Sequence, residues 1–373
     1  MSKVFAFSAE QDEFRTMVRR FVEANSSEAD VREQMETERG WDSAAWSAMA
    51  AQLGLQGLVI PEEFGGQGFG SLELCIVLEE MGRSLLCAPY FSTVVLAANT
   101  LLEAGDEDAK RALLPGIVSG QTIATVAFTE PNGRWDQSCI EATARNDGSA
   151  WKIHGTKLYV LDGHTADVVL VAARTGAGVS LFHVAGDAAG LTRTPLATLD
   201  PTRKQARLDF DDVEATRIGA DGTGWSVLSA VLDLAAVALA AEQVGGAQKC
   251  LDMSVEYAKD RVQFGRPIGS FQAIKHKCAD VLLEVESARS AAYYAGWCAS
   301  ERNDELPAVA SLAKAYCSDA YLHAASENIQ IHGGIGFTWE HAAHLYFRRA
   351  KSSDLLFGDA SYHRELVARR IGI

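Results

Sequence analysis

Residues suited to holding a phosphate-rich ligand gather in the last third of the sequence. A cation, side-chain amides and two adjacent glycines occur there within short motifs. Arginine presents forked donors that match phosphate oxygens, and glycine lets backbone N–H groups approach an anion closely. The pattern predicts a binding site for a diphosphate-containing ligand, formed by Arg261, Gln263, Phe264, Gln272, Gln330, Gly333 and Gly334.

The segments that carry these residues resemble the flavin clamp of acyl-CoA dehydrogenases: RVQFGRPI begins at Arg261, FQAI at Phe271 and QIHGGIGF at Gln330. The resemblance implies FAD as the cofactor and a contact from Arg261 to its diphosphate. It also implies an oligomer, because in that family this set reaches across a subunit interface to FAD held mainly by a neighbouring chain. Taken alone, Arg261 also fits a cation that closes a helix, where the macrodipole favours positive charge without a ligand.

A second segment, Ala127–Gly133, resembles the place where the family contacts the flavin of its own subunit. The resemblance implies that Thr129 lies near the pyrimidine edge of the isoalloxazine, although Thr129 also fits an ordinary turn residue. The small-residue turn that should follow is absent, because Arg134 and Trp135 stand where small residues let the backbone approach the diphosphate. A flavin-facing threonine is also replaced, by Leu161. We therefore expect this chain's own flavin pocket to have decayed.

The resemblance exposes a missing catalytic group. In the family, the carboxylate that removes the α-proton of an acyl-CoA stands at one of two positions, which align here to Ala235 and Gly358. The arginine that often follows the first is replaced by Ala236. We therefore predict no catalytic residue in this chain, with Asp359, the neighbour of Gly358, as the alternative base.

Other candidate catalytic groups fit less well. Asp233 lies about 200° around its helix from Ala235, and Glu242 lies on the same face but roughly 10 Å further along the axis. We expect Glu242 to be a satisfied polar residue of a helical bundle. His332 and His363 lack the serine or cysteine partner spacing of a nucleophilic triad, and no histidine or cysteine cluster predicts a metal.

Composition limits the class of protein. The formal charge of −15 over 373 residues opposes binding to nucleic acid and to anionic membranes. The start of the sequence has no secretory or transit pattern, which predicts a cytoplasmic location. Seven scattered cysteines form no paired motif and are expected to be structural thiols. The apolar run 227–241 is shorter than a membrane span and contains Asp233, so a buried helix is expected there.

Hydrophobic periodicity divides the chain into three parts. Residues 1–120 are predicted to be helical, and Ser8 with Gln11 forms a capping-box pattern before an apolar helical face that includes Met17 and Val18. Residues 121–220 are predicted to form a small antiparallel β domain, with strands at 122–128, 140–144, 151–154, 168–173 and 179–184, and residues 221–373 to be helical again. In the last part we expect helices near 223–260, 270–301, 306–332, 340–352 and 359–371. The class is α+β, mainly α. The family resemblance covers essentially the whole chain and implies an N-terminal helical domain, a middle β-barrel or sandwich and a C-terminal four-helix bundle.

The resemblance implies α,β-dehydrogenation of an acyl-CoA to a trans-2-enoyl-CoA, as in fatty acid β-oxidation and lipid metabolism. Since the base is missing, our first hypothesis is the non-catalytic subunit of a heteromeric enzyme, such as a heterotetramer. Its substrate would be a bulky acyl-CoA, for example from steroid degradation, bound mainly in the partner chain. Electron-transfer flavoprotein is the expected acceptor. The alternatives are a self-sufficient homo-oligomeric dehydrogenase with a displaced base, and a helical scaffold without flavin.

Overall fold

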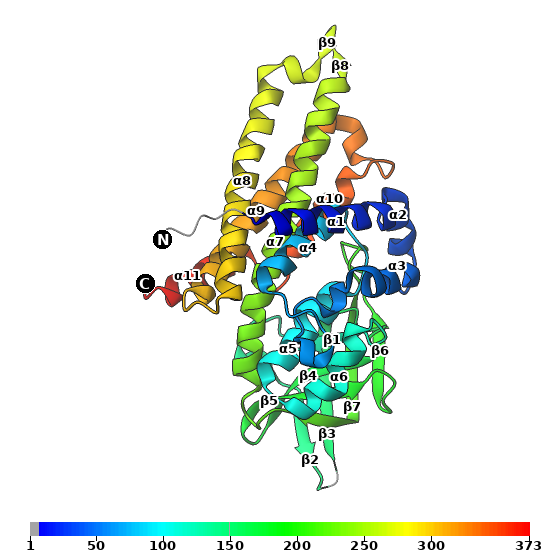
Figure 1. Ribbon diagram of the computed structural model, residues 1–373, viewed down its shortest axis with the longest axis vertical. Helices are drawn as coiled ribbons and strands as arrows, with labels where there is room; N and C mark the ends of the chain where they lie inside the picture. The colour runs from blue at the N-terminus through cyan, green and yellow to red at the C-terminus, as the bar shows by residue number, and fades with distance from the viewer. Residues whose placement is uncertain (1–6, 149) are drawn as a thin grey trace. The chain divides into compact units, whose positions relative to one another are not determined.

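The computed structural model describes residues 7–148 and 150–373, which fall into two compact units (Figure 1). Unit 1 combines residues 7–32, 70–86 and 236–373, and unit 2 combines 33–69 and 87–235. Each unit therefore gathers segments that are far apart in the sequence. The boundaries near residues 120 and 220 stay a prediction.

Helices form unit 1, and those after residue 221 follow the predicted ranges closely, because each apolar face repeats at the helical period. Its helices are α1 (Ala9–Asn25), α4 (Ser71–Arg83), most of α7 (Gly224–Asp260), α8 (Gln272–Ser300), α9 (Leu306–His332), α10 (Ala343–Leu355) and α11 (Ala360–Arg370). Helix α2 (Glu28–Glu36) begins in unit 1 and ends in unit 2.

The predicted capping box at the start of α1 is present. Ser8 Oγ accepts from the Gln11 N–H at 3.2 Å, and the Gln11 side chain accepts from the Ser8 N–H at 3.0 Å. Val18 is buried in the expected apolar face. Met17, which we placed on the same face, is 44% exposed. It lies about 100° around the axis from Val18, which puts it at the edge of the buried stripe.

Helix α7 is the one helix in the described part of the chain that is long and apolar enough to cross a membrane. Most of its apolar stretch, 61%, is buried inside the structure. Burial by protein is the environment of a core helix, and Asp233 interrupts the apolar surface. The structure thus agrees with the buried helix that we expected.

Unit 2 packs short helical segments with a seven-stranded sheet. The helical segments include α3 (Ser43–Ala48), a π-helical turn (Met49–Leu53), a second one (Phe91–Ala98), α5 (Asn99–Ala104) and α6 (Glu107–Val118). The strands are β1 (Ala124–Ala127), β2 (Thr143–Asn146), β3 (Trp151–Leu161), β4 (Val168–Thr175), β5 (Gly178–Ala185), β6 (Leu191–Pro195) and β7 (Gln205–Ile218).

The sheet closes on itself. Its order is β1-β4-β2-β3-β7-β5, and β5 also pairs with β4, which completes a ring of strands. The predicted barrel is therefore present and the predicted fold class is confirmed. The sheet is mixed rather than wholly antiparallel, because β1 runs parallel to β4 from Ala124↔Val168 to Ala127↔Val171, and β2 meets β4 in parallel at Thr143↔Arg174. A parallel pair is possible there because the strands are joined by a long crossover.

Candidate functional site

The arginine motif forms a short hairpin that follows α7. Strand β8 (Val262–Gln263) pairs with β9 (Arg266–Pro267) through the two-residue loop Phe264-Gly265. Both loop residues have positive φ, +52° for Phe264 and +76° for Gly265, as in the primed turns that match strand twist. Positive φ is unusual for phenylalanine, and this side chain is 91% exposed. Its one ring contact among the described residues is with Phe271, edge to face with centroids 6.0 Å apart, and most of its apolar surface stays exposed.

Arg261 stands at the junction between α7 and this hairpin. Its N–H donates to the Tyr257 carbonyl at 2.8 Å, and its carbonyl accepts from the Ile268 N–H at 2.8 Å. The backbone is therefore fixed. The guanidinium, in contrast, is exposed and has no hydrogen-bond or ion-pair partner among residues 7–148 and 150–373. A fixed, exposed and unpaired cation is suited to an external anion.

The predicted amides are also exposed. Gln263 Nε2 donates to the neighbouring Val262 carbonyl at 2.8 Å, and Gln272 Nε2 lies 3.3 Å from His276 Nε2. Gln330 makes no side-chain hydrogen bond to the part of the chain that the structure describes. These carboxamides remain open to a ligand.

The Gly-Gly turn ends α9. Gly333 has φ +64°, and its N–H donates back to the carbonyls of Gln330 and Ile329. A methyl group added to Gly333 or Gly334 would meet no atom within 4 Å. The two glycines therefore face open space, and no packing within this unit accounts for their lack of side chains.

The ends of α7 and α9 meet through their rings. Tyr257, one turn before Arg261, stacks on His332, which immediately precedes Gly333, with ring centroids 4.3 Å apart. The two parts of the predicted clamp, the Arg261 hairpin and the Gly333 turn, therefore lie next to each other in unit 1.

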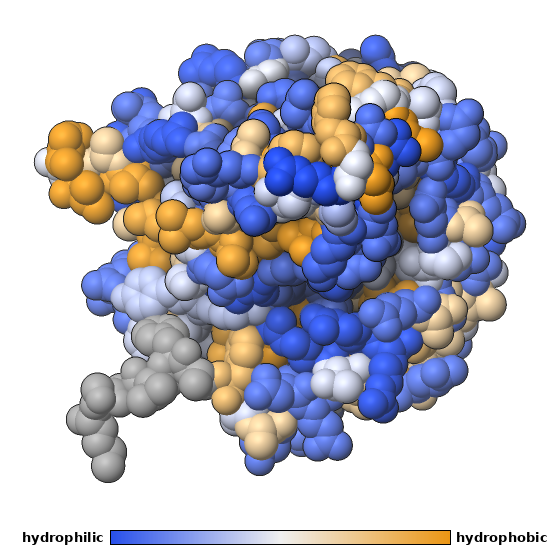
Figure 2. Space-filling model, turned by 90° about the horizontal axis from the view of Figure 1, so that it is seen from above, coloured by the Kyte–Doolittle hydropathy of each residue, from blue (hydrophilic) through white to orange (hydrophobic). Residues whose placement is uncertain are grey.

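Large apolar side chains near the clamp are exposed to solvent. Figure 2, which views the molecule from above, shows apolar side chains gathered in patches between hydrophilic ones. Soluble monomers rarely expose many large apolar groups together, so such surfaces indicate contact with another molecule. The large exposed apolar residues of the clamp segments, of α8 and of the turn after Phe337 are Val262, Phe264, Leu282, Leu283, Ile335, Phe337 and Trp339.

Thr129 belongs to unit 2, just after β1. It is only 7% exposed, and its carbonyl accepts from the Leu158 N–H at 2.9 Å. The next residue, Glu130, forms a buried ion pair with Lys157, with Oε1 and Nζ 2.6 Å apart. Thr129 is therefore held firmly by its backbone, and no hydrogen bond of its hydroxyl to a described residue is found.

The turn after Thr129 carries the bulky side chains noted in the sequence. Arg134 pairs with Asp136 at 3.0 Å, and the ring of Trp135 packs against Phe128 with centroids 5.9 Å apart. Leu161, at the place of the flavin-facing threonine, is 3% exposed and offers no donor. The bulky side chains of this turn are thus held by neighbouring residues, and the loss of the flavin pocket stays a prediction.

Neither base position carries a carboxylate, and at Gly358 the structure leaves no room for one. Ala235 is fully buried. Gly358 has φ +104°, and a Cβ there would lie 2.3 Å from a ring carbon of Tyr362. The Gly358 carbonyl accepts from the buried Lys314 Nζ at 3.1 Å, which fixes the backbone. At Gly358, the ring of Tyr362 occupies the space that a catalytic side chain would need.

The alternative carboxylates are already engaged. Asp359 is the N-cap of α11, and its Oδ1 accepts from the Tyr362 N–H at 2.8 Å. Glu242 forms a buried ion pair with Arg349 at 2.9 Å, as expected of a satisfied bundle residue. His363 is buried between the Ser311 hydroxyl and the Phe357 carbonyl. In the described ranges no group of histidine, cysteine or carboxylate side chains could hold a metal, and all seven cysteines are free thiols.

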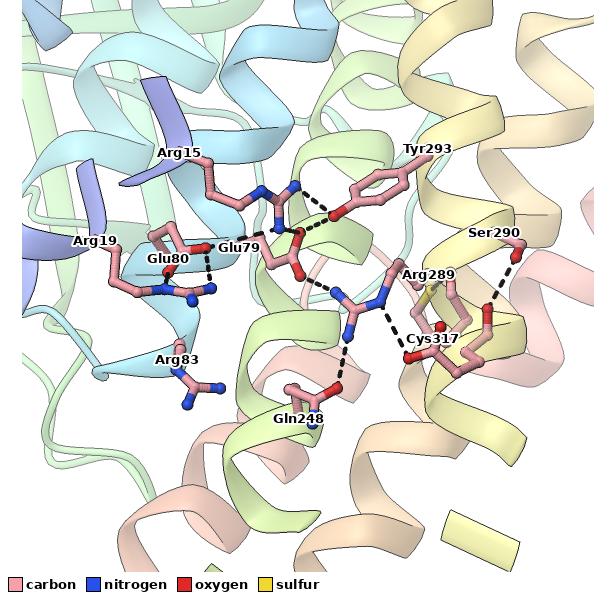
Figure 3. Close-up of polar contacts among 12 residues, drawn as sticks. Arg15, Arg19, Glu79, Glu80, Arg83, Gln248, Arg289, Ser290, Tyr293 and Cys317 are labelled. Atoms are coloured by element: carbon pink, nitrogen blue, oxygen red, sulfur yellow. Dashed lines mark hydrogen bonds and ion pairs between the residues drawn. The ribbon is translucent and has the colours of Figure 1, made fainter. Parts of the chain in front are cut away.

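Sequence analysis missed a buried charged cluster in unit 1, drawn in Figure 3. Glu79 of α4 accepts from Arg15 of α1 at 3.0 Å and from both Arg289 and Tyr293 of α8. Burial, together with the neighbouring Glu79 charge, raises the pKa of Tyr293, so the phenol keeps its proton. Glu80 binds a further arginine of α1, Arg19, through two hydrogen bonds of 2.8 Å. The cluster joins three helices and leaves Glu79 no free oxygen for chemistry.

Comparison with known proteins covers nearly the whole chain. Family models match residues 8–121 (Acyl-CoA dehydrogenase, N-terminal domain), 125–213 (middle domain) and 222–372 (C-terminal domain). The chain is 36% identical to acyl-CoA dehydrogenase IpdE2 of Mycobacterium tuberculosis, over 92% of each sequence.

Two solved heteromeric structures are also similar. A chain of the ChsE4-ChsE5 complex from Mycobacterium tuberculosis has a TM-score of 0.90 at 30% identity, covering 98% of both chains. A chain of a variant of the Tcur3481-Tcur3483 steroid ACAD has a TM-score of 0.87 at 33% identity, covering 97% of both. The three matched domains and these relatives define the class of the chain, an oxidoreductase that acts on CH–CH bonds. This chain belongs to the acyl-CoA dehydrogenase family.

Proposed function

We propose that this chain is the base-lacking subunit of a heteromeric, FAD-dependent acyl-CoA dehydrogenase. The observation that carries the proposal is a contrast within unit 1. Arg261 is exposed and unpaired among the described residues, as a cofactor contact should be, whereas the place of the catalytic carboxylate, Gly358, is filled by the ring of Tyr362. A chain with a working clamp and no base is useful only beside another subunit.

The donor set of the clamp fits FAD. The Arg261 guanidinium has no partner among described residues, the amides of Gln272 and Gln330 are exposed, and Gly333 and Gly334 open toward solvent. In our proposal these groups bind the diphosphate and adenine end of FAD, while Thr129 keeps only a minor contact. FAD, when bound, accepts the hydride that leaves the β-carbon of the acyl-CoA. The α-proton must then be taken by a carboxylate of the partner.

The substrate and the partner follow from the relatives. One similar structure is of a steroid ACAD and another is a complex of two different chains, ChsE4 and ChsE5. We propose a bulky acyl-CoA, such as a steroid side-chain thioester, and a second acyl-CoA dehydrogenase-like chain. The exposed apolar residues around the clamp supply the contact surface. Electron-transfer flavoprotein is the proposed acceptor, and the cytoplasm the proposed location.

The two alternatives meet specific difficulties. A self-sufficient dehydrogenase would need Asp359 as its base, yet this carboxylate caps α11. In a scaffold without flavin, the helix macrodipole would account for the cation at Arg261, but not for the two open glycines, Gly333 and Gly334.

The test is to measure flavin content and turnover of the purified chain, alone and after co-expression with candidate dehydrogenase-like partners. We expect negligible activity alone against straight, branched and steroid acyl-CoAs, and FAD bound in the complex. Robust turnover by the isolated, flavin-loaded chain would contradict the proposal. A complex that forms but holds no FAD would favour the scaffold.

A further inference from the structure

Three rings form a continuous stack where α7 and α9 end. Tyr257 and His332 are stacked with centroids 4.3 Å apart and planes 30° apart. His332 then packs on His341, with centroids 4.2 Å apart and planes tilted by 46°. His332 is 5% exposed, so the middle ring is enclosed by its neighbours. The stack joins three segments that are separate in the sequence: the helix before Arg261, the helix before Gly333 and the turn that leads into α10.

Hydrogen bonds fix the orientation of both imidazoles. His332 Nδ1 lies 2.8 Å from the Asn328 carbonyl, which can only accept, so Nδ1 carries the proton. His341 Nδ1 accepts from the Ala343 N–H at 3.1 Å, so its proton is on Nε2. The Nδ1 proton of His332 is present in both charge states of the ring, whereas an Nδ1 that accepts, as in His341, requires a neutral ring. Burial lowers the pKa of His332 and of His341, in agreement with that state.

A second tie lies one turn deeper. Ser254 and Asn328 are both buried, with Ser254 Oγ 3.1 Å from Asn328 Oδ1; the single hydroxyl proton is shared between this oxygen and the Cys250 carbonyl, 2.8 Å away in the same helix. Helices α7 and α9 are therefore linked twice in succession, first by this hydrogen bond and then by the ring stack. Beyond the stack no further tie is seen among the described residues, and the next groups along the chain are Arg261 and Gly333.

We infer that the Tyr257–His332–His341 stack positions the clamp, by holding Arg261 in register with the Gln330–Gly334 turn. The inference rests on the proposed function of the clamp and adds three positioning residues to it. Contacts between the rings, rather than hydrogen bonds of their polar groups, are expected to hold the two segments together. Tyr257 fits this role because its hydroxyl makes no hydrogen bond to a described residue, whereas its ring contacts His332.

The matched variants are Tyr257→Leu, which keeps an apolar side chain but removes the ring, and Tyr257→Phe, which keeps the ring and removes only the hydroxyl. Amide exchange in the isolated full chain is the first measurement, and it needs no FAD. We expect Tyr257→Leu to speed exchange at the Ile268 and Gly333 amides, and Tyr257→Phe to match the wild type. Equal exchange in all three proteins would overturn the inference.

The second measurement is FAD dissociation from the co-purified complex. We expect Tyr257→Leu to release FAD roughly two- to tenfold faster, the factor for loss of one aromatic pair, and Tyr257→Phe to restore the wild-type rate. In an Arg261→Ala background the same Tyr257→Leu change should have little further effect, because the group that the stack positions is gone. Additive effects would make the stack merely structural. If the wild-type complex holds no FAD, the proposed function fails, while amide exchange still decides the stack.

Discussion

Unit 1 uses arginine in two opposite ways. Around Glu79, Arg15 and Arg289 are largely buried and bind the same carboxylate, together with the Tyr293 hydroxyl (Figure 3). At the far end of α7, Arg261 is exposed and binds nothing in the described parts of the chain. The residue type is the same, and the chain also supplies carboxylates elsewhere on its surface that could have paired with it.

The contrast separates structural charges from binding charges. A buried charge must be paired, since an unpaired one costs several kcal/mol of desolvation, so the Glu79 cluster is explained by the fold alone. An exposed cation has no such requirement. Beyond the roughly 0.3–1 kcal/mol that the helix macrodipole supplies, it gains stability only from what it binds, and Arg261 sits on a backbone fixed by two hydrogen bonds of 2.8 Å. Fixed backbone and free side chain together indicate a ligand.

The largest effect should come from the buried side of the comparison. Glu79→Ala leaves Arg15 and Arg289 without their shared carboxylate, and breaking a buried pair costs about 3–5 kcal/mol of unfolding free energy. Denaturant unfolding of the isolated chain measures this loss. Glu365→Gln, which removes an exposed i,i+4 pair with Arg369, is the matched control and should leave stability unchanged. A small effect at Glu79 would break the distinction that we draw.

Arg261→Ala tests the exposed arginine of the comparison. It should remove a charge-assisted contact of about 1.5–3 kcal/mol, or roughly ten- to a hundredfold in FAD affinity of the complex, while hardly changing the melting temperature. Lysine should recover only part of the affinity, because it keeps the charge but loses the planar fork. FAD dissociation and thermal unfolding are measured on the same preparations. Arg20→Ala, which removes another exposed arginine, controls for net charge. Unchanged FAD retention with a large fall in melting temperature would make Arg261 structural.

The same contrast explains what the sequence could predict. The helices of unit 1 were predicted because their apolar faces repeat regularly, and the clamp because its residues lie in short motifs. The Glu79 cluster was not, since its members come from α1, α4 and α8, and only folding brings Arg15, Glu79 and Arg289 together. Nor does the sequence show that Tyr257 contacts His332.

In unit 2, β6 and β7 were missed for a different reason. The outward positions of β7 include Arg207, Asp211 and Asp212, and this charge conceals the buried alternation of Ala206, Leu208 and Phe210. The alternation was present in the sequence, and a period-two count that ignored the charges would have found it.

Buried groups should also make stability depend on pH. Burial, reinforced by the nearby Lys314 charge, lowers the pKa of His363 to about 3. The unfolded chain, with an ordinary histidine pKa near 6.5, binds the proton first, so folding stability falls as pH drops below about 6.5. From this group alone the loss is about 2 kcal/mol between pH 7 and pH 5. In the His363→Gln variant, the free energy of unfolding should change less with pH across that range. The exposed His154→Gln serves as control, and an equal slope in both variants would contradict the assignment.

The smallest effect concerns Asp359, a charge that is exposed like Arg261 but already partnered, by the Tyr362 N–H at 2.8 Å. As an N-cap, Asp359→Ala should cost about 1 kcal/mol of stability, whereas Asp359→Asn should cost almost nothing, because asparagine caps a helix equally well. A catalytic base would behave in the opposite way, since the amide keeps the shape and loses the basicity. Thermal unfolding of both variants, with turnover of the co-expressed complex, separates the two roles. If Asp359→Asn keeps its melting temperature but abolishes turnover, the carboxylate is a base, and the partner-subunit proposal fails at the residue nearest the empty position.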